Sequence, residues 1–274
     1  MSAATADARP DDAPLLLRDD ADGIATITLN RPAARNSLSL AMLEALEDAL
    51  SALSEDRSVR VVVLAAAGPV FSAGHDLREI TVHRADSDGG QAFFQRAMTK
   101  CATVMQMIVA LPQPVIAAVQ GVATAAGCQM VATCDLAVSS SAAKYCTPGV
   151  DIGLFCSTPA VALSRNVPRK AAMEMLLIGD MISAEDAHRI GLVNRVVAPE
   201  QVMPIALDLA RRIAARSALT VRLGKQAFYR QIDAGLHDAY EQAACTMVEN
   251  LLARDSGEGI GAFLGKRKPV WEDR

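Results

Sequence analysis

One stretch, residues 115–135, constrains this chain more than any other. It reads V-I-A-A-V-Q-G-V-A-T-A-A-G-C-Q-M-V-A-T-C-D, an apolar run followed by Gly121 and a series of small residues. Small residues such as Ala125 and Ala126 let backbone N–H groups come close to a ligand, and a helix that begins there adds the positive end of its dipole. The stretch therefore predicts either a site for a developing negative charge or a tightly packed, buried helix.

The remaining chain repeats the order strand, turn, helix. Alternating runs on both sides of Asp22-Gly23 predict a β-hairpin, and R-V-V-V-L-A at 60–65 predicts a strand that is buried on both faces. Ser37 or Ser39 is expected to cap a helix over residues 40–53. Right-handed crossovers of this kind stack into a layered α/β core with a parallel sheet, and the last third of the chain has a helical pattern.

Charge and cysteine usage narrow the classes of function. The 274 residues carry a net charge of −4, so nucleic acid is not an expected partner. The most apolar window, 115–134, is interrupted by two glutamines, and no membrane association is predicted. Six cysteines without C-x-x-C spacing predict reduced, mostly buried thiols, and no metal-ligand spacing is present.

Three segments are expected along the chain. Residues 1–14 have no apolar core and a single arginine, unlike a secretory signal or an arginine-rich transit sequence. They predict a disordered amino terminus and a cytoplasmic location. Residues 15–198 are expected to form the α/β core, and residues 199–274 a helical region for oligomerisation. Within the core, the polar segment 81–90 predicts a mobile surface loop.

Five sequence words follow one another in a specific order. They are L-N-R-P-A-A-R-N-S-L from Leu29, F-S-A-G-H-D-L-R-E from Phe71, G-V-A-T-A-A-G-C-Q from Gly121, I-S-A-E-D-A-H-R-I-G-L-V from Ile182 and A-F-L-G-K-R-K-P from Ala262. Over residues 15–270 the chain thereby resembles the crotonase superfamily, the enoyl-CoA hydratase/isomerase proteins. The words G-H-D-L, A-T-A-A-G-C-Q and G-L-F-C-S-T-P resemble a subgroup that lacks the usual catalytic glutamates.

The resemblance implies a crotonase-type spiral of ββα units with a helical C-terminal trimerisation region. It also implies an acyl-CoA thioester as the bound partner and a homotrimer or dimer of trimers. Coenzyme A would be part of the substrate, with no permanently bound cofactor. Fatty acid metabolism is the default pathway for such a protein.

The resemblance also implies site residues. The thioester carbonyl would lie between the backbone N–H groups of His75 and Ala126. Asp76 is expected to cap and fix the adjacent turn. The positions that match CoA contacts, of which the last two would come from a neighbouring subunit, are Ala34, Arg35, Ala73, Leu77, Arg78, Phe263 and Lys266. Without the resemblance, the basic members would be read as solvated surface charges, and Phe263 as a packing residue.

Two positions depart from the family pattern. Enoyl-CoA hydration uses two glutamates, and the matching residues here are Gln129 and Gly149. Glutamine can orient a water molecule but cannot accept its proton at pH 7, and glycine has no side chain. Each acid/base group contributes roughly 10²–10⁴-fold in rate, so ordinary hydration is expected to be weak or absent.

Other groups could take part in catalysis, although each has a simpler interpretation. Asp151, Ser157 and the His75 imidazole lie near the expected site in sequence, whereas Cys146 and Cys156 are expected to be inert buried thiols. Two classes of function stay open. One is an enzyme with altered acyl-CoA chemistry, such as thioester hydrolysis or decarboxylation; the other is a non-catalytic acyl-CoA binder or partner subunit.

Overall fold

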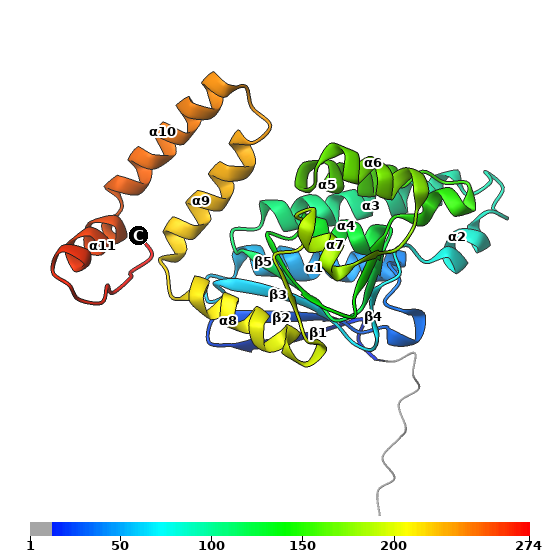
Figure 1. Cartoon of the computed structure of the whole chain (residues 1–274), viewed down its shortest axis with the longest axis horizontal. Helices are drawn as coiled ribbons and strands as arrows, with labels where there is room; N and C mark the ends of the chain where they lie inside the picture. Colours follow the sequence, from blue (N-terminus) through cyan, green and yellow to red (C-terminus); the bar gives the residue numbers. More distant parts are fainter. Residues whose placement is uncertain (1–12) are drawn as a thin grey trace, which may run out of the picture.

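The computed structural model describes residues 13–274, in which ten strands form two sheets (Figure 1). The expected disorder of residues 1–14 falls almost wholly outside the described residues. The strands are β1 (Leu16–Ala21), β2 (Ile24–Leu29), β3 (Val61–Ala66), β4 (Val70–Ser72), β5 (Val115–Val119), β6 (Val122–Thr124), β7 (Leu136–Ser140), β8 (Lys144–Cys146), β9 (Ile182–Ser183) and β10 (Arg195–Val197).

Eleven α-helices and three short 3₁₀ helices accompany these strands. The α-helices are α1 (Leu40–Glu55), α2 (Leu77–His83), α3 (Gln91–Ala110), α4 (Ala126–Thr133), α5 (Ser157–Asn166), α6 (Arg169–Ile178), α7 (Ala184–Arg189), α8 (Val202–Ala214), α9 (Ala218–Gln231), α10 (Leu236–Leu252) and α11 (Arg254–Leu264). The 3₁₀ helices are η1 (Pro32–Ala34), η2 (Pro148–Ile152) and η3 (Pro199–Gln201).

The chain winds as a spiral in which successive turns add one strand to each sheet. The larger sheet has the order β1-β2-β3-β5-β7-β10, and the smaller sheet has the order β4-β6-β8-β9. Thus β3, β5 and β7 lie in the large sheet, and the strands that follow them, β4, β6 and β8, lie in the small one. The strand pairs are parallel except β1 with β2 and β8 with β9. The predicted α/β spiral of ββα units is confirmed.

Local sequence signals explain the first elements. The β1–β2 hairpin turns at Asp22 and Gly23, whose φ values of 54° and 74° are the positive values that a type I′ turn requires. Ser39 caps α1 by accepting a hydrogen bond from the Met42 N–H, so the second of the two predicted caps is the one used. The predicted hairpin and helix are both confirmed.

Strand β3 is buried on both faces, as its apolar sequence predicts. Val62 and Leu64 belong to the core that α1 and α3 cover, whereas Val61 and Val63 belong to the core on the opposite face. Helix α8 covers that opposite face through its apolar residues Val202, Ala206 and Ala210. Because side chains alternate along a strand, a run without polar residues suits a sheet covered on both sides.

The stretch 115–135 forms β5, β6 and α4, and its glycines are required by packing. A Cβ atom at Gly121 would lie 1.9 Å from the Pro69 carbonyl oxygen, and one at Gly127 would lie 2.4 Å from the Ser72 carbonyl oxygen. All eight residues of α4 are buried. The tight-packing interpretation of this stretch is therefore confirmed for these two glycines.

The segment 81–90 is more structured than the sequence suggests. Helix α2 continues to His83, whose ring stacks on Phe93 with 3.7 Å between the ring centroids. The Asp88 carboxylate accepts hydrogen bonds from the Gly90 and Ala92 N–H groups at the start of α3. The predicted surface loop is therefore confirmed for residues 84–90, which form mostly exposed turns, and is wrong for residues 81–83, which belong to α2. Aromatic stacking and an aspartate cap organise the ends of this loop.

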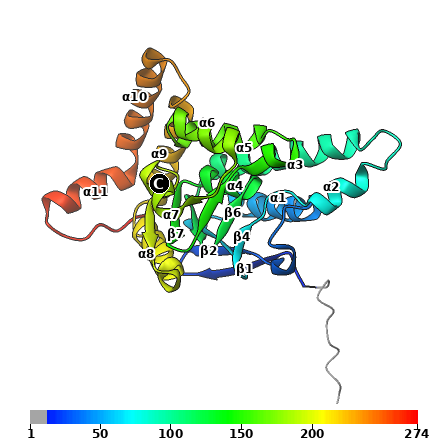
Figure 2. The same cartoon turned by 45° about the vertical axis from the view of Figure 1, so that its right-hand side comes forward.

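Helices α10 and α11 extend away from the two sheets in both views of the chain, and α9 leads to them (Figures 1 and 2). By contrast α8, which lies inside the expected segment 199–274, packs on the large sheet. Helix α11 was not predicted as a separate element. Among residues 13–274, no helix has the length and apolar character needed to cross a membrane.

A buried ion pair connects α9 to the core. The Lys225 Nζ lies 2.7 Å from the Asp135 Oδ2 and also donates to the Ile108 and Gln113 carbonyl oxygens. Tyr229 donates its hydroxyl to the other carboxylate oxygen at 2.9 Å. Burial lowers the pKa of the Lys225 ammonium, whereas the Asp135 carboxylate opposes this shift. The charges stay buried because each one has close partners.

The carboxyl-terminal segment folds back against α11 at Asp255, and Trp271 in this segment donates to the Ala215 carbonyl at the end of α8. The buried Asp255 carboxylate accepts hydrogen bonds from the Glu272 N–H at 2.7 Å and the Asp273 N–H at 3.0 Å. Burial raises the pKa of Asp255, but hydrogen bonds from Ser217 and from these two N–H groups outweigh it, so the pKa lies below its usual value.

Lys225→Met should lower the free energy of unfolding by about 3–5 kcal/mol, because it leaves the Asp135 carboxylate buried without its cation. Denaturant unfolding followed by circular dichroism measures this change. The matched control is Lys225→Met/Asp135→Leu, which should recover much of the loss. Additive losses in the double variant would show that the two charges do not depend on each other.

Asp255→Asn should lower the free energy of unfolding at pH 7 by about 1–3 kcal/mol, because the asparagine loses charge-assisted hydrogen bonds. A carboxylate whose folded pKa is depressed stabilises the fold above its unfolded pKa, near 3.8, and loses that contribution as the pH falls through the folded pKa. The difference between wild type and variant should therefore shrink from pH 7 to pH 3. A constant difference across this range would contradict the role of the charge.

Candidate functional site

The first part of the site is the backbone at His75, after the carboxyl end of β4. Leu38 and His75 form an isolated parallel bridge, in which the Leu38 N–H donates to the Gly74 carbonyl and the Asp76 N–H donates to the Leu38 carbonyl. In a parallel bridge of this kind the N–H of the central residue points away from the partner strand. Within residues 13–274 the His75 N–H has no hydrogen-bond acceptor.

The second part is the first turn of α4. Ala126 begins this helix, so its N–H has no intrahelical acceptor, and residues 13–274 supply no other. Ala125 precedes it with φ 50° and ψ −119°, a conformation that favours glycine. An alanine held there shows that the surrounding structure determines the direction of this peptide.

Gly74 brings these two backbone segments together. A Cβ atom at Gly74 would lie 2.9 Å from the Ala125 Cβ and 3.1 Å from the Ala126 backbone nitrogen. Gly74 also has φ 79°, which a residue with a side chain rarely adopts. The two predicted donors, His75 and Ala126, are thus neighbours across a contact with no room for a methyl group.

Two buried side-chain atoms near these donors lack hydrogen-bond partners among the described residues. They are the His75 Nε2 and the Gln129 Oε1, and Gln129 is only 4% exposed, about one helical turn after Ala126. Burial lowers the pKa of the His75 imidazole, although a backbone hydrogen bond with Leu38 opposes this. The lowered pKa favours the neutral imidazole at pH 7.

Gly149, which matches the second glutamate of the family pattern, has no room for a side chain. A Cβ atom at Gly149 would lie 2.6 Å from the Leu154 carbonyl oxygen and 2.8 Å from the Cys156 Sγ. The Leu154 N–H also donates to the Gly149 carbonyl, so the turn is held against this residue. Gly149 supplies no functional group, and the chain after it occupies the space of a side chain.

The alternative groups lie close to this turn in sequence. Asp151 is exposed on η2, and exposed Ser157 makes its side-chain hydrogen bond to the Phe155 carbonyl. Cys146 and Cys156 are buried, and burial raises the pKa of both thiols, as expected for inert cysteines. Among the described residues the Ser157 hydroxyl has no hydrogen bond to a histidine or a carboxylate that could activate it.

Asp76 holds the turn between β4 and α2. Its carboxylate accepts hydrogen bonds from the Arg78 and Glu79 N–H groups, and this confirms the predicted cap. Arg31 donates to the same carboxylate at 2.6 Å, and the Ser37 hydroxyl donates at 3.1 Å. Burial raises the pKa of Asp76, but the hydrogen bonds from Arg31, Glu79 and Ser37 lower it below the usual value.

A buried asparagine that sequence reasoning missed shapes the preceding loop. Asn36 has φ 50° and is fully buried. Its amide donates to the Ala67 and Val70 carbonyls and accepts from the Arg31 N–H. Asparagine tolerates this left-handed conformation, and its place in the word N-R-P-A-A-R-N-S was the available signal.

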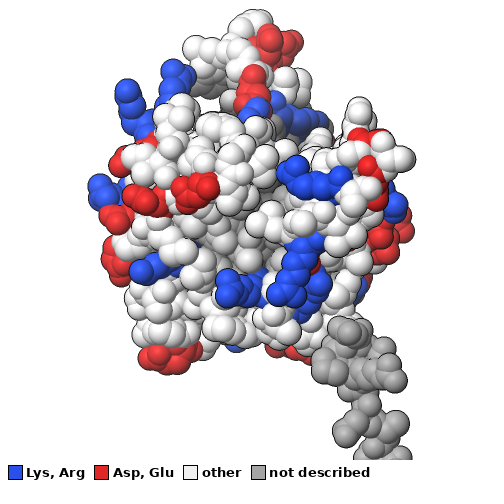
Figure 3. Space-filling model, turned by 90° about the vertical axis from the view of Figure 1, so that its right-hand side faces the viewer, with Lys and Arg blue, Asp and Glu red and all other residues white. Residues whose placement is uncertain are grey.

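Five of the seven predicted CoA positions come together on one side of the fold. The Ala73 N–H donates to the Arg35 carbonyl, so the loop after η1, with Ala34, lies against the strand end after β4. Leu77 and Arg78 are exposed on the first turn of α2. Figure 3 shows the face that carries α2, where lysine and arginine side chains lie beside an uncharged hollow.

Phe263 and Lys266 lie at the other end of the chain. Phe263 is 83% exposed on α11, which stands far from α2 in both cartoon views (Figures 1 and 2). One chain therefore does not bring these two residues to Arg78. Phe263 and Lys266 could therefore join the predicted CoA site only from a second subunit.

The comparisons with known proteins agree with this geometry. A family model described as enoyl-CoA hydratase/isomerase matches residues 19–274. The human mitochondrial enoyl-CoA hydratase domain-containing protein 3 is 47% identical over 250 residues, which cover 91% of this chain and 81% of that protein. The rat counterpart is 48% identical over 250 residues, which cover 91% of this chain and 82% of that protein.

Solved structures give the same result. An enoyl-CoA hydratase from Mycobacterium smegmatis is 51% identical with a TM-score of 0.91, covering 94% of this chain and 99% of that one. The human domain-containing protein 3 has 46% identity and a TM-score of 0.90, covering 94% of this chain and 100% of that one. The predicted resemblance, including its subgroup, is confirmed.

The predicted cytoplasmic location is wrong by these comparisons, since the similar vertebrate proteins are named mitochondrial. That prediction used only the composition of the first 14 residues, which lie almost wholly outside the described part of the chain. The family itself is established by the match over residues 19–274 together with the two sets of relatives. The chain belongs to the enoyl-CoA hydratase/isomerase family.

Proposed function

We propose that this protein binds acyl-CoA thioesters and holds the thioester carbonyl oxygen between the N–H groups of His75 and Ala126. The observation that carries the proposal is this pair of N–H groups, which lack acceptors in residues 13–274 and belong to segments in contact at Gly74. An oxyanion or enolate gains most from donors that are already oriented, and one such donor is worth about 3 kcal/mol where measured.

The nucleotide part of CoA would lie along the face that carries α2. Arg35 and Arg78 are exposed there and suit phosphate groups by charge, while Ala34, Ala73 and Leu77 offer apolar contacts. The hydrogen bond between Ala73 and Arg35 supports a single binding surface, because it fixes the two segments relative to each other.

A neighbouring subunit would complete the CoA site with Phe263 and Lys266. Helices α9–α11 expose many large apolar side chains, which is unusual for a surface that faces only water. They include Phe228, Leu236, Tyr240, Met247, Leu251, Leu252 and Phe263. These side chains support a homotrimer, or a dimer of trimers, in which the helical region packs on other copies.

We propose further that ordinary enoyl-CoA hydration is slow in this protein. Gln129 cannot take a proton from water, and the turn at Leu154–Cys156 leaves no room for a carboxylate at position 149. The retained N–H donors still favour binding and polarising a thioester. The site therefore supports an acyl-CoA binder with weak or altered chemistry.

Gln129→Glu should raise the rate of crotonyl-CoA hydration by about 10²-fold over a wild-type rate well below 1 per second, because it restores one proton-transfer group. Product formation followed by mass spectrometry measures the rate. Gln129→Leu is the matched control, since it fills similar space without a base. Wild-type turnover of about 1–10³ per second would contradict the importance of the lost glutamates.

Arg78→Ala should weaken crotonyl-CoA binding about tenfold in calorimetry, because it removes a charge-assisted contact to phosphate. The loss should diminish at high salt, since Arg78 is exposed. Arg195→Ala, an exposed arginine on β10, serves as the control. Crotonyl-pantetheine, which lacks the nucleotide, should bind wild type and Arg78→Ala equally; an equal loss for both ligands would contradict the assignment.

A further inference from the structure

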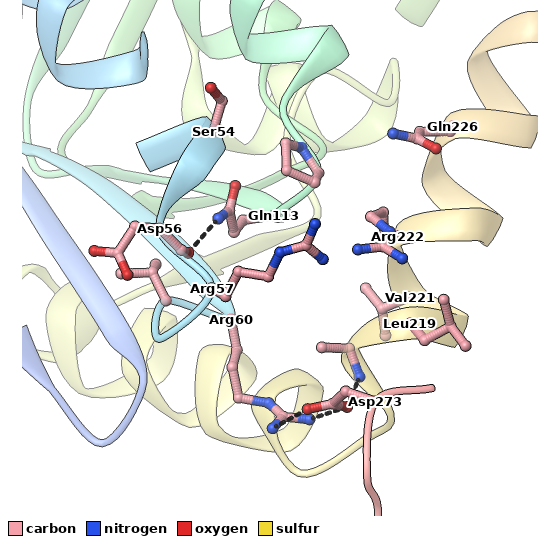
Figure 4. A pocket seen from close by; sticks show the side chains of 13 residues that line it. Ser54, Asp56, Arg57, Arg60, Gln113, Leu219, Val221, Arg222, Gln226 and Asp273 are labelled. Carbon is pink, nitrogen blue, oxygen red and sulfur yellow. Dashed lines mark hydrogen bonds and ion pairs between the residues drawn. The ribbon is translucent and has the colours of Figure 1, made fainter. Parts of the chain in front are cut away.

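A cavity lies where strands β3 and β5 of the large sheet begin, away from the proposed acyl-CoA site. It has a volume of about 510 Å³ and lies between the end of α1, the turns that lead into β3 and β5, and the first turns of α9 (Figure 4). His75 and Ala126 follow the carboxyl ends of strands, whereas this cavity lies where the parallel strands begin. The two sites are therefore separate.

The charges around the cavity leave two cations without acidic partners. Its two carboxylates are already engaged, because Asp56 pairs with Arg18 at 2.8 Å and Asp273 pairs with Arg60 at 3.1 Å. Arg57 and Arg222 form no ion pair within residues 13–274.

Figure 4 shows the guanidinium groups of Arg57 and Arg222 pointing toward one another across the cavity. Arg57 comes from the turn before β3, and Arg222 from α9. Two like charges that face each other repel, and an anion between them converts this repulsion into two attractive contacts. Each guanidinium can also donate two parallel hydrogen bonds to phosphate oxygens.

A buried acceptor adds a second requirement on the ligand. Gln113 is 6% exposed and lines the cavity. Its Nε2 donates to the Leu53 and Asp56 carbonyl oxygens, but its Oε1 has no partner among the described residues. A buried acceptor without a partner is unfavourable, so a ligand with a hydroxyl or amino group that donates to this oxygen would gain binding free energy.

The walls and size of the cavity suit a small organic molecule better than a bare ion. Val59, Leu219 and Val221 line it together with the polar groups. Small-molecule sites in proteins commonly have volumes of roughly 300–1,000 Å³, apolar walls and a few polar groups that fix orientation. A phosphate ion alone would leave most of this space, and the Gln113 acceptor, unused.

We propose that this cavity binds a small organic phosphate that also carries a hydrogen-bond donor. The phosphate group bridges the guanidinium groups of Arg57 and Arg222, and a hydroxyl or amino group donates to the Gln113 Oε1. Because Arg57 belongs to the core and Arg222 to α9, the bound molecule joins the C-terminal helices to the sheet. The occupancy of the cavity thereby affects how firmly those helices are held.

Calorimetry with glycerol 3-phosphate at low salt tests the proposal on the full chain, with inorganic phosphate and glycerol as comparison ligands. We expect glycerol 3-phosphate to bind more tightly than inorganic phosphate, and glycerol not to bind. Arg57→Ala and Arg222→Ala should each weaken binding at least tenfold. Arg57→Lys, which keeps the charge but not the fork of donors, should weaken it less.

Two controls place the anion in this cavity. Arg211→Ala removes an exposed arginine of α8 outside the cavity, and Arg78→Ala removes a basic residue from the proposed acyl-CoA site. Neither change should alter binding of glycerol 3-phosphate. The proposal is overturned if wild type does not bind this ligand at millimolar concentration, or if Arg78→Ala abolishes binding while Arg57→Ala and Arg222→Ala do not. Equal affinity for glycerol 3-phosphate and inorganic phosphate would also contradict the proposal that the ligand is an organic phosphate.

Discussion

The close approach of backbone to backbone between successive turns of the spiral is the constraint on which this structure depends. Gly121 lies against the Pro69 carbonyl, Gly127 against that of Ser72, and Gly74 against Ala125 and Ala126. A side chain at any of these glycines would push two turns apart. Since the small sheet is made of strands only two or three residues long, these contacts rather than long ladders set how the turns are stacked.

The same contacts explain why the proposed donors can survive the loss of acid/base groups. The N–H groups of His75 and Ala126 are positioned by main-chain packing, which does not depend on a carboxylate nearby. At Gly149 the opposite holds, because the following turn has moved into side-chain space. The two N–H groups are therefore held by main-chain packing, whereas position 149 is closed by packing.

Charged groups stabilise the contact between the C-terminal helical region and the core. Lys225 and Asp135 form a buried ion pair to which Tyr229 adds a hydrogen bond. The Asp255 carboxylate accepts hydrogen bonds from two N–H groups of the carboxyl-terminal segment. Arg57 and Arg222 face each other at the same junction without any acidic partner in the described chain. The junction is thus stabilised by the paired charges of Lys225 and Asp135, whereas Arg57 and Arg222 provide the proposed anion site.

The sequence by itself determined the spiral, the hairpin, most helices and the family, because apolar periodicity, turn residues and five ordered words are local properties of the chain. It also placed His75, Ala126 and Gln129 near one another through those words. Only the tertiary structure decided that position 149 has no room for a carboxylate, that Asn36 organises the loop before α1, and that Phe263 lies far from Arg78 in one chain. These outcomes depend on contacts between residues distant in sequence, where side-chain volume and hydrogen-bond partners are set by segments that no local pattern can bring together.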